Sequence, residues 1–327
     1  MFKILRNFTW FLIELPKQLF VIQEQKMVSI THCKNVIIIN LIKNTNLIFF
    51  QVLEIHRGDL DSYPYLGLLV LDDNDLQTLE EDALGRHEYL SRLWLNGNKL
   101  TLVPQSLPTA LKSLYMEKNK IHSLRHGDFR SLVNLEELFL KQNNIQDIAY
   151  TALRDLVSLK ILDLQANKIK NITESIFINL TLLETLDLSQ NPLLLIGQNA
   201  FTGLSTLRML QLSKIHTTVS TSESAYTPLK TLQVLEMYGS PDMVSKVISS
   251  TRLLQSLNSI HELNFMHNGI SLLRSDFASF FPKLELAKLS GNVWNCSDPD
   301  KILWMKDWML RSSVRFYRSY SIRYVFI

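Results

Sequence analysis

The sequence has little of what several kinds of functional site require. Only two of its 327 residues are cysteine and ten are glycine, and no phosphate-binding glycine motif of the usual form is present. The histidines form no H-E-x-x-H motif of the kind that binds zinc in metalloproteases. No uncharged apolar run reaches the roughly 18–20 residues that a membrane-spanning helix needs. These absences predict a protein that is not an enzyme and has no cofactor, no bound metal and no transmembrane segment.

The charge balance is close to neutral. The formal net charge of +3 is small for this length and argues against a nucleic-acid partner held by charge. Hydrophobic residues make up 46% of the chain, which is ample for a core and excludes wholesale disorder. We therefore expect a folded protein whose partners are not nucleic acids.

Three consecutive segments repeat one pattern with a period of 24 residues. They read LEELFLKQNNIQDI, LKILDLQANKIKNI and LETLDLSQNPLLLI and begin at Leu135, Leu159 and Leu183. In each copy, leucines stand at positions one, four and six and an asparagine stands at position nine. A fixed period of this length is the signature of a solenoid built from stacked repeats.

The same pattern extends in both directions from this stretch. The unit that begins at residue 232 is 28 residues long, and its segment MVSKVISSTRLLQSL has apolar residues at helical spacing. A degenerate first unit begins at Ile42, so that eleven units cover 42–292. The other added units begin at residues 66, 90, 111, 207, 260 and 284.

The residue types explain why such units stack. Leucines at positions four and six alternate with exposed residues, which is the period of a half-buried strand, so stacked units form a parallel sheet. The asparagine amide both donates and accepts hydrogen bonds and can satisfy backbone groups at the bend after the strand. We predict a ladder that is interrupted at Ile215 and Ser240, which replace the asparagine. Its members are Asn74, Asn98, Asn119, Asn143, Asn167, Asn191, Asn268 and Asn292, and a second spine on the returning side consists of Phe129, Leu153, Phe177 and Phe201.

The outward strand positions line one concave face, where the array can bind a partner. Position five of successive units holds three neighbouring aromatics and then two acids. Exposed aromatics flanked by charges suit a protein-binding hot spot. The alternative is that the aromatics only pack against their cross-strand neighbours. The predicted partner-binding residues are Arg92, Trp94, Tyr115, Glu117, Glu137, Phe139, Lys141, Asp163 and Asp187.

The two cysteines lie at opposite ends of the array. Cys33 and Cys296 are separated by about ten strand spacings of about 4.8 Å, or about 45 Å. A disulfide needs Cα atoms within about 7 Å, so the two cysteines cannot pair within one chain. They are either inert thiols or form an intermolecular disulfide in a homo- or hetero-oligomer.

Sequons for N-glycosylation occur at Asn7, Asn171, Asn179 and Asn295. A handful is expected by chance in a chain with this much Asn, Ser and Thr, so the sequons do not establish secretion. Asn171 and Asn179 fall on the expected turn and returning side of a unit, where a glycan would be tolerated.

The units resemble leucine-rich repeats of the 24-residue kind found in extracellular animal proteins. Such proteins include Toll-type ectodomains, small leucine-rich proteoglycans and insect immune proteins. The ending LSGNVWNCSDPDKILWMKDWML resembles the carboxy-terminal cap of these arrays, although Val293 replaces a proline and Asp298 a second cysteine. The resemblance implies an α/β fold, a leucine-rich repeat horseshoe with a parallel concave sheet and with loops, 3-10 turns or short helices on the convex side.

The resemblance also implies three segments and a function. Residues 1–41 would form a partial cap preceded by a damaged secretory signal, 42–292 the repeat array, and 293–327 a partial cap with a truncated basic tail. The concave face would recognise a protein or glycan in a secreted or cell-surface protein of innate immunity or matrix assembly. The alternative is an intracellular adaptor or regulatory scaffold with the same fold, located in the cytoplasm.

Overall fold

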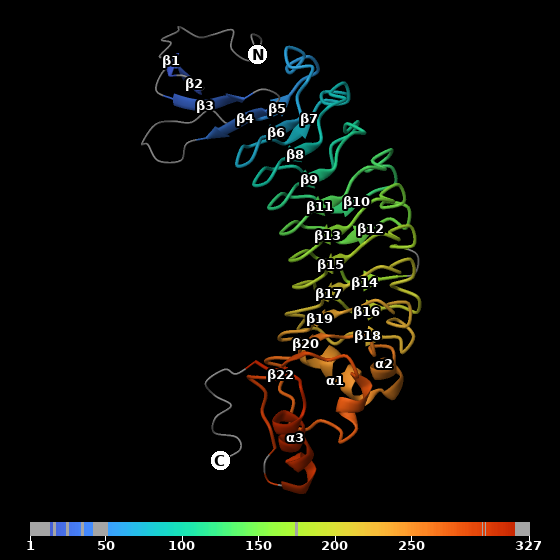
Figure 1. Ribbon diagram of the computed structural model, residues 1–327. Helices are drawn as coiled ribbons and strands as arrows, with labels where there is room; N and C mark the ends of the chain where they lie inside the picture. The colour runs from blue at the N-terminus through green and yellow to red at the C-terminus, as the bar shows by residue number, and fades with distance from the viewer. Residues whose placement is uncertain are drawn as a thin grey trace. The chain divides into compact units, whose positions relative to one another are not determined.

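The computed structural model describes most of the chain after residue 51 and four strands before it (Figure 1). The described residues fall in two compact units, Met1–Leu159 and Lys160–Ile327. For the strands before residue 42 and for residues 299–302, only the backbone is described. The described ranges are 14–15, 18–23, 26–33, 36–41, 52–173, 176–295, 297 and 299–317.

The first unit contains short strands at regular intervals. Their bounds are β1 (Glu14–Leu15), β2 (Gln18–Gln23), β3 (Lys26–Cys33), β4 (Val36–Leu41), β5 (Glu54–Ile55), β6 (Leu68–Val70), β7 (Thr78–Leu79), β8 (Arg92–Trp94), β9 (Ser113–Tyr115), β10 (Ser123–Leu124), β11 (Glu137–Phe139) and β12 (Asp147–Ile148). One sheet has the order β1-β2-β3-β4-β6-β8-β9-β11, antiparallel as far as β4 and parallel from β4 onward. On the returning side β5 pairs with β7 and β10 with β12.

The second unit repeats this plan and adds helices. Its elements are β13 (Ile161–Asp163), β14 (Asn171–Ile172), β15 (Thr185–Asp187), β16 (Leu195–Ile196), β17 (Met209–Gln211), β18 (Ser220–Thr221), β19 (Val234–Glu236), α1 (Pro241–Ser249), α2 (Thr251–Gln255), β20 (Glu262–Asn264), η1 (Phe277–Phe280), β21 (Leu286–Lys288), α3 (Pro299–Arg311) and β22 (Arg315–Phe316). The strands β13-β15-β17-β19-β20-β21-β22 form a parallel sheet in that order. Behind it, β14, β16 and β18 form a small parallel sheet.

Each repeat strand buries its central residue, which is leucine in every strand except β21, where it is Ala287. Leu93 lies opposite Leu69 on one side and Leu114 on the other, and all three side chains have an exposed fraction of 0%. The flanking residues of a strand point the other way because successive side chains alternate across a sheet. Full burial of a leucine contributes about 1.5–3 kcal/mol, so the leucine stack is the main source of stability. The predicted solenoid of leucine-rich coils with a parallel sheet is confirmed.

On the side of β6 away from β8, the neighbouring strand is β4, which ends at Leu41. The degenerate first unit was expected to begin at Ile42, and the residues in which it would place its strand lie outside the described residues. The boundary at residue 42 therefore stays a prediction.

Within each unit, the asparagine ladder joins a coil to the coil before it. Asn98 Nδ2 donates to the carbonyl oxygen of Leu71 at 2.9 Å and to that of Leu95 at 3.0 Å. Its Oδ1 accepts the N–H of Leu76 at 3.1 Å. The same arrangement recurs at Asn119, Asn143, Asn191 and Asn292. The side chain thus satisfies backbone groups of two coils, as the sequence predicts.

Ser240 continues the ladder, and the prediction that it interrupts the ladder is wrong. Its Oγ accepts the N–H of Ile215 at 3.0 Å and donates to the carbonyl oxygen of Leu212 at 2.7 Å. A hydroxyl can replace the amide here because it too both donates and accepts. Ile215 itself contributes a fully buried apolar side chain at its ladder position.

The residue before each ladder position has a left-handed backbone. For L-residues other than glycine this conformation costs about 1–2 kcal/mol, and it persists because the bend after the strand requires it. Glycine fills the position in only three coils, so no residue type marks it in the sequence. The φ angles are Asp73 54°, Gly97 64°, Lys118 53°, Gln142 56°, Ala166 55°, Gln190 58°, Lys214 56°, Gly239 61°, His267 55° and Gly291 75°.

Large apolar side chains fill the returning side of both units. In the second unit, Phe177 stacks on Phe201 with ring centroids 6.5 Å apart, and Phe201 lies 5.5 Å from Tyr226. All three side chains are fully buried, so the predicted spine extends one coil further than expected. The Tyr226 hydroxyl has no hydrogen-bond partner among the described residues, and burial raises its pKa.

One predicted helical segment is confirmed, and a further helix, α3, lies in the cap. The apolar spacing after residue 241 forms α1 and α2, which bury Met243, Val244 and Leu253. In the cap, Trp308 of α3 packs against Phe277 and against Phe316 of β22 at centroid distances of 6.1 and 4.9 Å. No helix in the described part of the chain is long and apolar enough to cross a membrane.

Candidate functional site

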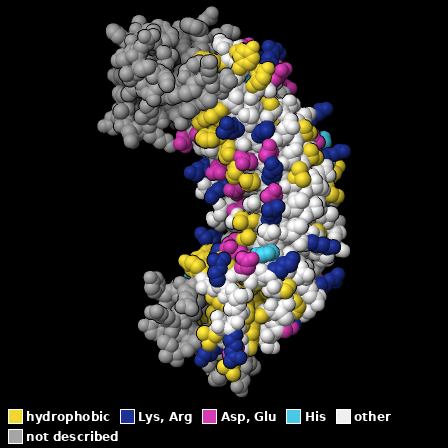
Figure 2. Space-filling model, viewed as in Figure 1, with side chains coloured by type: hydrophobic (Ala, Val, Ile, Leu, Met, Phe, Trp, Pro, Cys, Tyr) yellow, Lys and Arg dark blue, Asp and Glu magenta, His cyan; other side chains and the backbone are white. Residues whose placement is uncertain are grey.

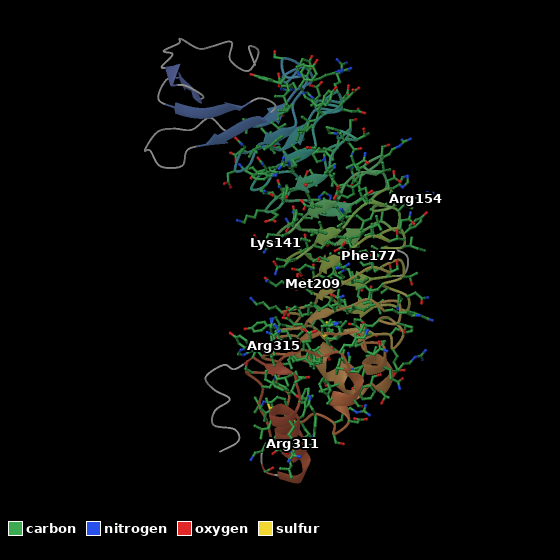
Figure 3. The ribbon with its side chains drawn as sticks, viewed as in Figure 1. Lys141, Arg154, Phe177, Met209, Arg311 and Arg315 are labelled. Carbon is green, nitrogen blue, oxygen red and sulfur yellow. The ribbon has the colours of Figure 1, made fainter. Side chains whose placement is uncertain are left out.

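Side chains at positions three, five and seven of each coil point away from the leucine core. We call them the open face of each unit, which corresponds to the predicted concave face. Figure 2 shows hydrophobic, basic and acidic side chains mixed along the strands. In Figure 3, Met209 lies on the strand side of the second unit, and Phe177 lies toward the returning side. On the open face of each unit, the backbone is regular and the side chains differ from coil to coil, so this face is the candidate binding surface.

The first unit contains a row of three aromatic rings on its open face. We call Trp94, Tyr115 and Phe139 the aromatic row; they are opposite one another on β8, β9 and β11. The rings of Tyr115 and Phe139 are stacked with centroids 4.7 Å apart and planes inclined by 6°. Trp94 meets Tyr115 edge-on, with centroids 5.3 Å apart and planes at 68°. All three side chains are half-buried.

The stacking determines what the aromatic row can contact. Stacking covers one face of Tyr115 and one face of Phe139, so ring edges make up much of the surface that a partner can contact. Ring edges carry partial positive charge and suit apolar side chains and carbonyl oxygens, whereas a cation prefers a ring face. The Trp94 Nε1 is buried and has no hydrogen-bond partner among the described residues. The aromatic row is therefore an apolar contact surface that also contains one hydrogen-bond donor without a partner among the described residues, Trp94 Nε1.

Charged side chains surround the aromatic row. The Tyr115 hydroxyl donates to Glu137 Oε2 at 3.0 Å, and burial together with Glu137 raises the pKa of Tyr115. Arg92 is exposed on β8, and Glu117 and Lys141 are half-buried at position seven of their coils. The structure thus brings together the seven predicted binding residues from Arg92 to Lys141 on one face of the first unit.

Position seven carries a second ladder that sequence reasoning missed. Asp72 Oδ1 accepts the N–H of Asn96 at 2.7 Å, and Asn96 Oδ1 accepts the N–H of Glu117 at 2.8 Å. In the second unit, Ser189 Oγ accepts the N–H of Ser213 at 3.0 Å. Burial raises the pKa of Asp72, although the hydrogen bonds from Asn96 oppose the shift. Asp, Asn and Ser all occur at position seven, so no single residue type marks the second ladder in the sequence. What these residues share is a side-chain oxygen that accepts a hydrogen bond.

The open face of the second unit has a different chemistry. Asp163 and Asp187 are opposite each other on β13 and β15. Each carboxylate accepts a backbone N–H two residues on, from Gln165 and Ser189 respectively, at 2.8 Å. Position three of β13, β15, β17 and β19 holds half-buried side chains that the sequence reasoning did not single out. They are Ile161, Thr185, Met209 and Val234.

A charged cluster ends this face. Lys288 Nζ lies 3.2 Å from Glu236 Oε1 and also contacts Glu262. Burial lowers the pKa of Lys288, but its hydrogen bonds and attraction to Glu262 and Glu236 outweigh burial and raise the pKa above its usual value. The lysine side chain thus connects carboxylates of β19 and β20.

The remaining predicted sites are exposed or lie outside the described residues. Asn171 and Asn295 are exposed and Asn179 is half-buried, so the glycosylation hypothesis stays a prediction. The side chains of Cys33 and Cys296 lie outside the described residues, and the intermolecular disulfide stays a prediction as well. Within the described part of the chain, no three or more His, Cys, Asp and Glu side chains are grouped so that they could hold a metal ion.

Comparison with known proteins agrees with this geometry. A family model described as "Leucine rich repeat" matches residues 109–169 and 158–214, which contain the most regular coils. The coils within residues 109–214 therefore match leucine-rich repeats, and the resemblance read from the sequence is confirmed.

Two solved structures share the fold. One is the crystal structure of a TLR13–ssRNA13 complex, with a TM-score of 0.53 and 21% identity over 81% of this chain. This chain spans 49% of that protein, about half its length. The other is the octameric complex of Latrophilin 3 (Lec, Olf), Unc5D (Ig, Ig2, TSP1) and FLRT2 (LRR), with a TM-score of 0.59, 20% identity, and coverage of 78% of this chain and 84% of that one. At these identities the likeness establishes the fold.

Proposed function

We propose that this protein is a non-catalytic binding module that recognises a protein partner through the open face of its repeats. The observation that carries the proposal is the aromatic row with its charged surroundings. Rigid, half-buried aromatics flanked by charges are typical of the anchor residues of protein interfaces. The leucine-rich repeat fold supports the same conclusion, because it displays such side chains on a regular backbone.

The charges favour a protein over a nucleic acid. A phosphate backbone is bound mainly by lysine and arginine. The open faces carry the carboxylates of Glu137, Asp163 and Asp187, which would repel phosphates. The TLR13 structure contains single-stranded RNA, and that partner is a property of that protein.

The test uses Trp94→Ala combined with Phe139→Ala. Partners are first selected by screening the whole chain against an arrayed set of extracellular proteins, and each dissociation constant is then measured. We expect the double variant to bind at least about 30-fold more weakly, because the loss of a single anchor residue already costs about 2 kcal/mol or more. Thermal unfolding of the variant checks that the coils remain folded.

Tyr150→Ala provides the matched control. Tyr150 is an aromatic residue of the same unit with an exposed fraction of 74%, and it lies after β12, outside the open face. Its removal should leave affinity unchanged. Equal affinity of the double variant and the natural protein would show that the aromatic row is purely structural.

An extracellular role is supported by the resemblance of the 24-residue coils and of the cap around Trp304 and Trp308 to secreted arrays. We propose a secreted or cell-surface protein of innate immune recognition or matrix assembly. The alternative is an intracellular adaptor with the same binding face, and a disulfide-linked oligomer through Cys33 or Cys296 belongs to the extracellular proposal alone.

A further inference from the structure

The open face of the second unit combines apolar and acidic side chains in neighbouring columns. Ile161, Met209 and Val234 lie at position three of β13, β17 and β19, with Thr185 of β15 between the first two, and we call these three residues the apolar column. Asp163 and Asp187 lie at position five of β13 and β15, followed by Gln211 of β17 and Glu236 of β19, and we call the two aspartates the acidic column. Position three and position five of one strand are about 6.6–6.8 Å apart, so one partner segment can contact both columns.

Position three is more apolar in this unit than in the first. There the first unit has one apolar residue, Leu68, followed by Arg92, Ser113 and Glu137, which are polar or charged. Met209 and Val234 are instead half-buried apolar side chains on the face that does not contact the leucine core. Half-buried apolar side chains next to carboxylates match a partner that is itself apolar on one side and basic on the other.

The same face already shows how a basic side chain engages its carboxylates. Lys288 reaches from β21 to Glu236 of β19 and to Glu262 of β20. Asp163 and Asp187 likewise belong to neighbouring strands, about 4.8 Å apart. A basic side chain of a partner could bridge these two carboxylates as Lys288 bridges the two glutamates.

We propose that the open face of β13 to β19 binds a cationic, amphipathic segment of a protein partner. Its basic side chains lie over Asp163 and Asp187, and its apolar side chains pack against Ile161, Met209 and Val234. Successive helical turns are about 5.4 Å apart, close to the strand spacing of about 4.8 Å, so a basic amphipathic helix places one side chain on each strand. This inference rests on the proposed function and names the partner chemistry of a second surface.

The test measures binding of a synthetic helical peptide of lysine and leucine, with the two residue types on opposite faces. The whole chain should bind it, and Asp163→Ser combined with Asp187→Ser should weaken binding by about tenfold or more. Serine keeps an oxygen for the N–H groups of Gln165 and Ser189, so the turns are retained. The salt dependence of the affinity should also flatten in this variant, because fewer charge pairs form.

Two controls separate charge from shape. Asp147→Asn removes one exposed carboxylate from β12, outside the open face, and should not change peptide binding. Met209→Gln keeps the length of the side chain and should weaken binding severalfold without changing the salt dependence. Because this variant leaves both aspartates in place, it tests the surface even if the double variant fails to fold.

Three results would overturn the inference. They are unchanged peptide binding by both the aspartate and the Met209 variants, equally tight binding of a glutamate–leucine peptide, and tighter binding of a single-stranded RNA oligonucleotide. The Trp94→Ala, Phe139→Ala variant should bind the lysine–leucine peptide normally. Failure of the aromatic row as an anchor and failure of this acidic–apolar surface are thus distinguishable.

Discussion

Single polar side chains at the bends determine how one coil meets the next. The amide of Asn143 donates to the carbonyl oxygens of Met116 and Leu140 at 2.9 and 3.0 Å, and it accepts the N–H of Ile121 at 3.0 Å. Its exposed fraction is 6%, so water does not replace these bonds. The ladder is therefore structural, and its residues are not available to a partner.

Replacement of Asn143 by alanine should lower the free energy of unfolding by about 1–3 kcal/mol, because it leaves buried backbone groups without partners. Urea denaturation followed by circular dichroism measures the change. Asn144→Ala is the control, because no hydrogen bond is found for the Asn144 side chain among the described residues, and it should change stability by less than about 0.5 kcal/mol. Equal stability of the two variants would contradict the structural role of the ladder.

The ladder could be predicted from the sequence because the same residue type recurs at the same place. The left-handed residue before it could not, since Asp73, Lys118 and Ala166 have no side-chain property in common. Ser240 could not be predicted as a ladder residue either. Its hydroxyl makes the hydrogen bonds that an asparagine amide makes elsewhere, but a pattern based on asparagine excludes it. Equivalent positions of successive coils share a backbone conformation or a hydrogen-bonding group even where they do not share a residue type.

At the scale of the coil, the strand side is constant and the returning side varies. The coil that begins at residue 232 is longer and accommodates α1 and α2, yet β19 and β20 still pair in the expected register. Additional residues are therefore taken up behind the sheet. The sequence predicted this because the leucine pattern marks the strand and helical spacing marks the insertion.

Close approach of neighbouring coils on the returning side makes Gly203 a sensitive position. A Cβ at Gly203 would lie 2.4 Å from the carbonyl oxygen of Ile178 and 2.5 Å from that of Phe177, and its φ is 99°. Gly203→Ala should therefore destabilise the protein by more than about 2 kcal/mol, since both backbone strain and a clash with backbone atoms oppose it.

Gly239→Ala separates these two causes. Its φ of 61° is also left-handed, but the nearest atom to an added Cβ is Lys214 Cγ at 4.0 Å. This variant should cost only about 1 kcal/mol, the price of the backbone conformation. Thermal and urea denaturation of both variants provide the comparison, and equal destabilisation would show that the close approach of the coils has no energetic effect.

At the scale of the whole molecule, the fold is easier to predict from the sequence than the binding surface is. The leucine pattern recurs in every coil and so indicates the fold many times over, whereas the residues of a binding surface occur only once in the sequence. The sequence predicts that Asp163 and Asp187 belong to one binding surface with the aromatics; both aspartates lie in the second compact unit, and the shared surface stays a prediction. The apolar column through Met209 was missed because leucine-like residues at position three resemble core residues until the strand register is known.

The cellular location gives a prediction for the entire chain. Expressed in animal cells with its own amino-terminal segment, the protein should appear in the medium or at the cell surface and lose mass on treatment with an N-glycosidase. Substitution of Asn171, Asn179 and Asn295 by glutamine should remove the mass difference contributed by these sequons. Recovery of an unmodified chain from the cytosol alone would favour the intracellular adaptor instead.

The direction of the asparagine ladder has a consequence for synthesis. Each ladder side chain reaches back to the preceding coil, as Asn98 does to Leu71 and Leu76, so a coil has its bend completed only by the coil that follows. During synthesis, the bend of the newest coil therefore stays incomplete until about one further repeat has been made. This takes about 1–5 s at about 5–20 residues per second. The growing tip is always the incomplete part of the nascent chain.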